Sequence, residues 1–319
     1  MAKPFASSTD LDEKTETLEI VADGVYALTA EGDPNVGAVE GDDFLVAFEA
    51  RATPQAARDW LAKLREYTEK PVRYLVLSHY HAVRVLGASA FDSDEIIASD
   101  ATRFLIEERG EEDWASEFER MPRLFKEPDE IPGLTRPTLT FSDALAIDLG
   151  GDRGSLELQF CGRGHTAGDI VVWHDKSKTL FAGDLVEAEA ALYTGDAFHM
   201  EWADKTLDRV KAYEANALIG GRGAVVKGRS AVDAAIEQTR EFLLVMQEQV
   251  KSVHDANGSL KEAFQKTHTA LAPKFGHWPI FEHCLPFNVQ RLWDEYDDVD
   301  WPRIWTRDRD REVWAALQD

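Results

Sequence analysis

The sequence has 319 residues, of which 44% are hydrophobic and 29% are charged, a composition typical of a globular protein with one large domain and an appendage. Its 59 acidic and 35 basic residues give a formal net charge of −24, which argues against nucleic acids and anionic membranes as partners because both require basic patches. No segment has the roughly 18 consecutive apolar residues of a membrane span.

Residues 16–50 predict two β-hairpins. Residues 17–30 alternate in polarity on both sides of Asp23-Gly24, a dipeptide that favours a tight hairpin turn. Residues 35–50 repeat this pattern around a turn that begins at Gly41.

Residues 53–70 predict a helix, with Thr53 as its N-cap and Pro54 at the first helical position. The nearly continuous apolar run 72–78 is typical of a strand buried on both faces. A strand, a helix and a strand in close succession indicate an α/β unit.

Residues 96–99 predict another short strand, and Ser99 is a suitable cap for a helix over 100–110 that ends at Gly110. Residues 111–137 are charged and contain several prolines, so they predict a mixture of helix and loop. Short apolar segments separated by Gly and Asp turns then predict strands at 138–141, 145–151, 155–162, 169–175 and 179–186, followed by a helix at 202–215 and a strand at 217–221.

The chain changes character after residue 228. Apolar residues at helical spacing predict helices over 230–258, 259–276 and 286–300. We therefore expect a β-rich domain over 1–228 and a helical C-terminal extension over 229–319. The extension would pack on the β-rich domain or form a homodimer.

Four side chains carry the chemistry. His79 and His81 follow a predicted buried strand, and side chains at i and i+2 of an extended segment point to the same side. They therefore form a candidate metal clamp. His165 lies in a glycine-flanked loop between two predicted strands, and Asp184 follows a further apolar strand.

These residues stand in three motifs that resemble, in order and spacing, those of the metallo-β-lactamase-fold hydrolases. The motifs are His79-Tyr80-His81, Gly164-His165-Thr166-Ala167-Gly168-Asp169 and Phe181-Ala182-Gly183-Asp184. The resemblance covers about residues 16–228 and is to the metabolic or uncharacterised metallohydrolases rather than to the antibiotic-degrading lactamases. It implies an α/β fold, a four-layer αββα sandwich with metals at one edge of the two sheets.

The resemblance fails at specific positions. The family pattern His-x-His-x-Asp-His has its Asp replaced by Val83 and its last His replaced by Arg84. The histidine that the family carries in a later Gly-His-Gly turn is replaced by Arg222. In the family, all three missing residues belong to the second of two metal sites, and the Asp at position 184 bridges both sites.

The residues that remain predict one metal ion. The resemblance assigns His79, His81 and His165 to the first site with Asp184, and three neutral histidines suffice to bind one Zn²⁺, or alternatively Fe²⁺. Arg84 and Arg222 would place permanent positive charges where the second metal would lie.

The resemblance implies a metal-dependent hydrolase, and the residues that remain predict that it is mononuclear. We expect it to use metal-bound water on a small anionic ester, lactone, thioester or amide. Asp184 is the candidate catalytic residue, as a metal ligand or a proton acceptor. Arg84, Arg222, His199 and His283 are candidate substrate-binding residues. The arginines could instead only pair with Asp184, His199 could be an exposed loop residue, and His283 could serve packing.

Two other functions remain open. A tri-histidine iron centre could support redox or oxygenase chemistry, which the loss of the family's Asp at position 83 would allow. A catalytically inactive protein of the same fold could bind a small molecule. No apolar signal-peptide segment stands in residues 1–20, and Cys161 and Cys284 lack disulfide spacing, so we expect a cytoplasmic protein.

The remaining polar residues have supporting or surface roles. Asp169 is expected to orient the His165 loop through hydrogen bonds. Glu49 is expected to support His79 and His81 as a carboxylate next to the metal ligands. His174, His254 and His268 are expected at the surface.

Overall fold

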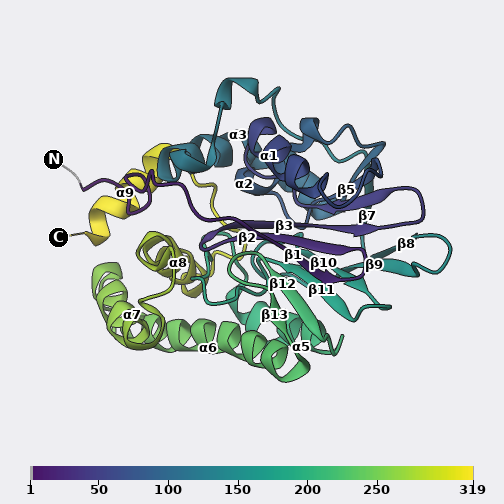
Figure 1. Cartoon of the computed structure of the whole chain (residues 1–319). Coiled ribbons are helices and arrows are strands. Elements are labelled where there is room, and N and C mark those ends of the chain that lie inside the picture. The colour runs from purple at the N-terminus through teal and green to yellow at the C-terminus, as the bar shows by residue number, and fades with distance from the viewer. Residues whose placement is uncertain (1–2, 319) are drawn as a thin grey trace.

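The computed structural model describes residues 3–318, and its strands form two sheets that pack face to face (Figure 1). The first sheet follows the chain order. β1 to β4 are antiparallel neighbours, whereas β4 to β7 run parallel. Its strands are β1 (Thr17–Ala22), β2 (Val25–Ala30), β3 (Asp33–Glu40), β4 (Leu45–Phe48), β5 (Val72–Val76), β6 (Glu95–Ser99) and β7 (Leu139–Phe141).

The second sheet has the order β13-β12-β11-β10-β9-β8, in which only β11 and β12 pair in parallel. Its strands are β8 (Ala144–Asp148), β9 (Ser155–Phe160), β10 (Ile170–His174), β11 (Thr179–Gly183), β12 (Ala217–Gly220) and β13 (Val226–Lys227).

An apolar layer between the two sheets holds the sandwich together. Phe48 of β4 and Phe181 of β11 meet there with ring centroids 5.2 Å apart. Gly37 of β3 permits this contact, because a Cβ at that position would collide with the Phe181 ring. Burial of such large aromatic surfaces is a main source of folding free energy.

Helices cover the outer faces of both sheets, so the αββα sandwich is confirmed (Figure 1). α1 (Pro54–Leu64) and α3 (Asp100–Arg120) lie over the first sheet, with 3₁₀ turns at Ala88–Ala90, Pro122–Leu124 and Pro128–Glu130. Residues 199–211 form one irregular helical segment on the second sheet. It comprises α4 (His199–Glu201), a π-helical turn (Trp202–Thr206) and α5 (Leu207–Lys211).

The predicted starts of the first two long helices are confirmed, but their predicted ends are wrong. Thr53 Oγ1 accepts a hydrogen bond from Ala56 N at 3.1 Å, and Ser99 caps α3 in the same way. α1 ends at Leu64, before the predicted residue 70. α3 continues through Gly110 to Arg120, and the loop residue Leu134 packs against this glycine, 3.1 Å from where a Cβ would lie.

The C-terminal extension consists of α6 (Arg229–His254), α7 (Leu260–Phe275), α8 (Phe281–Tyr296) and α9 (Arg307–Leu317), the last of which the sequence pattern did not predict. α6, α7 and α8 share one apolar core with the second sheet. α9 lies beside α3 and the N-terminal segment (Figure 1), where Ser116 donates a hydrogen bond to Asp310 at 2.5 Å. None of the described helices is long and apolar enough to span a membrane. The domain boundary at residue 228 remains a prediction.

Candidate metal centre

Three strand ends bring the four predicted residues together at one edge of the sandwich. His79 and His81 follow β5, His165 lies between β9 and β10, and Asp184 follows β11. The turn before Asp184 contains Gly183 with φ of +52°, and a Cβ there would lie 2.6 Å from Ser78 Oγ. A glycine is therefore needed for the two loops to approach each other.

One nitrogen of each histidine points to a common centre. Nε2 of His165 lies 3.0 Å from Nδ1 of His81, and one ligand atom from each of the three histidines lies within 4.8 Å of the others. Nε2 of His79 is buried and has no hydrogen-bond partner among the described residues. Zinc with nitrogen ligands at about 2.0 Å in a tetrahedron requires nitrogens about 3.3 Å apart. The three residues can therefore hold a divalent metal ion once the more widely spaced nitrogens move inward by about 1 Å.

Each ring also makes a hydrogen bond through its other nitrogen, on the side away from the common centre. His165 Nδ1 donates to the carbonyl of Tyr193 at 2.8 Å, which leaves the Nε2 lone pair unprotonated. His79 Nδ1 pairs with Ser78 Oγ at 2.8 Å. His81 presents its other nitrogen, Nε2, to the Asp196 carboxylate at 3.3 Å. Such outer contacts fix the tautomer and orientation of metal-binding histidines.

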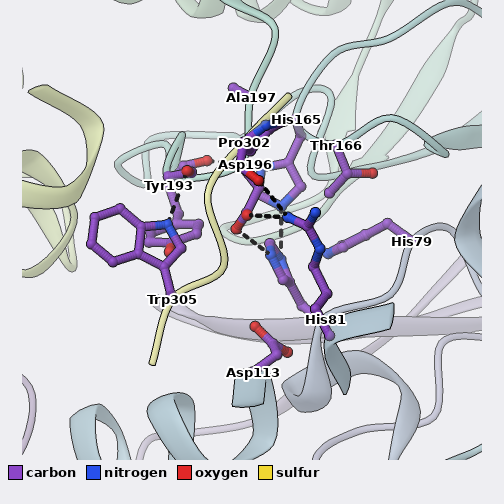
Figure 2. Close-up of polar contacts among 12 residues, drawn as sticks. His79, His81, Asp113, His165, Thr166, Tyr193, Asp196, Ala197, Pro302 and Trp305 are labelled. Atoms are coloured by element: carbon purple, nitrogen blue, oxygen red, sulfur yellow. Dashed lines mark hydrogen bonds and ion pairs between the residues drawn. The ribbon is translucent and has the colours of Figure 1, made fainter. Parts of the chain in front are cut away.

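The charge environment differs among the three rings. Burial holds the pKa of His79 well below its ordinary value and lowers the pKa of His165 to about 3, so both are neutral ligands. Burial also opposes protonation of His81, but Asp113 and Asp196 outweigh it and raise its pKa to about 9. Figure 2 shows these two carboxylates on opposite sides of the His81 ring.

Asp184 joins the histidines to the two arginines. Its Oδ2 atom lies 3.8 Å from His79 Nε2 and 3.6 Å from His165 Nε2. Arg84 pairs with Oδ1, and Arg222 Nη1 lies 3.0 Å from Oδ2. Burial alone would raise the pKa of Asp184, but the two guanidiniums hold it well below its ordinary value.

The arginines are themselves buried and positioned by the fold. Arg84 is fully buried in the short helix α2 (Ala82–Val85) and also donates to the backbone carbonyls of Asn35 and Gly221, at 3.1 and 2.8 Å. Arg222 also contacts Glu187 at 3.2 Å. Val83, which stands at the family's Asp position, packs in the apolar core under the first sheet.

Two carboxylates of α3 complete the support of this loop. Asp113 accepts a hydrogen bond from Ala82 N at 2.7 Å, and Glu117 accepts one from Val83 N at 2.9 Å. Together they satisfy the first N–H groups of α2, which have no partner within the helix. No sequence motif marks these two residues or Asp196, so none of the three was predicted.

Asp169 and Glu49 support the histidine loops. Asp169 accepts hydrogen bonds from N and Oγ1 of Thr166, at 2.6 and 3.0 Å, which confirms its predicted role in orienting the His165 loop. Glu49 accepts a hydrogen bond from Ser78 N at 3.2 Å, one residue before His79.

The histidines outside the candidate centre differ in how deeply they are buried. His199 is buried, not exposed as one interpretation had it, because Thr194 Oγ1 at 2.8 Å and Glu295 Oε2 at 3.1 Å bind its ring nitrogens. The surface prediction is also wrong for His174, whose ring is buried between Ser177 and the Arg153 carbonyl. His254 and His268 are partly exposed.

A small cavity adjoins the candidate metal centre. The free volume of this cavity is about 10 Å³, roughly what one water molecule needs. Its walls include His81, Asp184, Arg222 and the buried His283. A groove of about 470 Å³ opens elsewhere on the surface but contains none of the candidate ligands, so size alone does not locate the site.

Comparisons with known proteins identify the family and the fold. A family model described as the metallo-beta-lactamase superfamily matches residues 30–222. A linear primary-alkylsulfatase of Pseudomonas sp. (strain ATCC 19151) is 22% identical over 244 residues, which are 66% of this chain and 45% of the relative.

Two solved structures share the fold. A double mutant of the sec-alkyl sulfatase PisA1 has a TM-score of 0.71 and 16% identity, over 88% of this chain and 50% of that chain. A metallo-beta-lactamase from Pontibacter korlensis has a TM-score of 0.56 and 19% identity, over 71% of this chain and 99% of that chain. The chain thus spans about half the length of the alkylsulfatases that it matches.

Proposed function

The chain belongs to the metallo-β-lactamase superfamily, and from this premise we propose that it is a mononuclear metal-dependent hydrolase of a small anionic substrate. The observation that carries the proposal is the convergence of three histidine nitrogens whose outer hydrogen bonds leave lone pairs for one metal. Zn²⁺ is the expected ion and Fe²⁺ the alternative, since imidazole suits both.

Arg84 and Arg222 are the reason why we expect one bound metal ion and not two. Arg84 and Arg222 both pair with Asp184, and each is less than one-twentieth exposed. A second divalent ion at that place would meet two permanent positive charges in a buried site, where Coulomb repulsion is poorly screened.

Each residue then has a distinct role. His79, His81 and His165 would hold a divalent ion, which when bound polarises the substrate and lowers the pKa of water to about 7. Asp184 Oδ2 lies close enough to both Nε2 atoms to act as a fourth ligand or to accept a proton from the attacking water.

The substrate class follows from the residues around the cavity. Arg222 and His283 line it and would bind the anionic group directly. Arg84 and His199 are fully buried and would act through their neighbours Asp184 and Thr194. Because two relatives are named as alkylsulfatases, alkyl sulfate esters are the first substrates to test, before anionic lactones, thioesters and amides.

The test is metal content by elemental mass spectrometry on the native protein and on a His79→Ala/His165→Ala variant. We expect about one equivalent in the native protein and none in the variant. A His254→Ala/His268→Ala variant, altered at two partly exposed histidines, is the matched control and should keep its metal. Two equivalents would contradict the mononuclear proposal, and iron as the bound metal would favour redox or oxygenase chemistry.

A catalytically inactive binding protein is the second candidate, and one observation favours it. Asp184 is already paired with both Arg84 and Arg222, and the adjoining cavity holds only about one water molecule. Absence of bound metal after incubation with Zn²⁺ or Fe²⁺ would support this alternative and exclude the hydrolase.

A further inference from the structure

Part of the buried face of α3 is charged, although helices usually bury apolar side chains. Arg109, Asp113 and Glu117 stand four residues apart, so their side chains lie on the same side of the helix, and all three are buried. Asp113 and Glu117 bind the backbone directly after His81. Arg109 therefore lies one helical turn from residues that support the candidate metal centre, on the same face of α3.

The guanidinium of Arg109 divides its hydrogen bonds between the surface and the interior. Nε and Nη2 donate to Glu108 Oε2 at 2.9 and 2.5 Å, and the side chain of Glu108 is 30% exposed. Nη1 instead donates to Asp196 Oδ1 at 3.3 Å and to the carbonyl of Pro302 at 3.2 Å. The ion pair with Glu108 alone therefore does not explain why Nη1 is directed to two oxygens in the interior.

Asp196 uses its two carboxylate oxygens for different partners. Oδ1 accepts the hydrogen bond from Arg109, whereas Oδ2 lies 3.3 Å from His81 Nε2. When Nδ1 of a neutral histidine binds a metal, Nε2 keeps the ring proton and donates it to an acceptor on the far side. A charge-assisted hydrogen bond to one oxygen of a carboxylate also fixes the direction of the other oxygen. Arg109 can therefore fix the acceptor that orients the His81 ring.

The C-terminal extension gives Arg109 a further anchor. Pro302 lies between α8 and α9, and its carbonyl shares Nη1 of Arg109 with Asp196. Pro302 and Asp196 both appear in Figure 2. The neighbouring residue Trp301 covers the guanidinium, whose Cζ lies 5.6 Å from a ring centroid of the indole. The extension therefore helps to hold Arg109 in place.

We propose that Arg109 is a positioning residue of the metal centre, which holds Asp196 against His81 and links the centre to the C-terminal extension. The proposal rests on the proposed function for the presence of a metal ion. The hydrogen bonds of Arg109 go to Glu108, Asp196 and Pro302 and not to a candidate ligand. Its effect should therefore be on the affinity and geometry of metal binding.

The test is Co²⁺ binding to the metal-free full chain, followed by the visible absorption of the bound ion, which depends on ligand geometry. Arg109→Gln should weaken binding about tenfold, the lower end of the effect of losing an outer partner of a metal-binding histidine. It should change the Co²⁺ spectrum in the same way as Asp196→Asn. Arg103→Gln is the matched control, because Arg103 lies on the same helix and forms an exposed pair with Glu107 at 3.1 Å. It should change neither affinity nor spectrum.

A double-mutant cycle separates positioning from general destabilisation. In the Asp196→Asn background, Arg109→Gln should weaken Co²⁺ binding less than about twofold, because the carboxylate through which it acts is already lost. Equal losses in both backgrounds, or an unchanged affinity and spectrum in Arg109→Gln, would overturn the proposal. Circular dichroism verifies folding. Arg109→Lys takes the place of Arg109→Gln in the cycle if that variant does not fold, because one ammonium group cannot reproduce the planar guanidinium fork.

This proposal and the proposed function fail in different ways. Co²⁺ affinity that depends on Arg109 through Asp196, in a protein whose zinc form hydrolyses no anionic ester, lactone, thioester or amide, would keep the positioning role and reject the proposed function. Hydrolysis by zinc-loaded Arg109→Gln with native metal affinity would do the reverse. A native chain that binds neither Co²⁺ nor Zn²⁺ would reject both.

Discussion

Replacement of Asp184 by Asn removes the carboxylate charge that Arg84 and Arg222 share, and it leaves the side-chain volume nearly unchanged. Both guanidiniums are buried, and Arg222 Nη1 lies 3.0 Å from the carboxylate. Loss of one partner of a buried ion pair costs about 3–5 kcal/mol because the remaining charge stays uncompensated.

We expect the lower end of this range, about 3 kcal/mol, for two structural reasons. The amide oxygen of Asn can still accept one hydrogen bond. Glu187 lies 3.2 Å from Arg222, and burial together with the charge of Asp184 raises its pKa to about 8. Without Asp184, Glu187 would ionise more readily and compensate part of the charge of Arg222.

The assay is urea unfolding of the metal-free protein in the presence of a chelator, which gives the free energy of unfolding from the midpoint and slope. Asp300→Asn is the matched control, because Asp300 is 80% exposed and pairs with Arg163 at 3.4 Å. An exposed pair contributes about 0.5 kcal/mol or less. If the two variants differ by less than about 1 kcal/mol, the cluster does not depend on the Asp184 charge and the reasoning is wrong.

Four further outcomes are expected. Asp196→Asn should lower metal affinity about 10–100-fold in a chelator competition while the circular dichroism spectrum stays unchanged, because the carboxylate orients His81. Since the pKa of His81 is about 9, metal must displace a proton from that ring, and affinity should fall about tenfold per pH unit below 9. A pH-independent affinity between about pH 7 and 8.5 would contradict this. Gly221→Ala should destabilise the protein by about 1–3 kcal/mol in urea unfolding, because the new Cβ would collide with Asp184. Thr53→Ala should cost about 1 kcal/mol in the same assay through loss of the helix cap.

The sequence by itself determined the sandwich and the three histidines of the centre. Strands, hairpin turns and helix caps depend on neighbouring residues, and Thr53 and Ser99 therefore cap the predicted helices. The motif histidines could be found because His79, His81 and His165 stand in motifs that resemble those of the metallo-β-lactamase-fold hydrolases. Helix ends were less predictable, since α3 continues past Gly110, although glycine locally favours a helix end.

The tertiary structure alone decided which groups surround those histidines. Asp196 reaches His81 across 115 residues, and Arg120 of α3 and His283 of α8 line the same cavity although they are far apart in the sequence. No local pattern marks such residues, because their side chains are brought together by packing of the layers and not by spacing along the chain. The burial that shifts the pKa of His165 and Asp184 is likewise a property of the assembled layers.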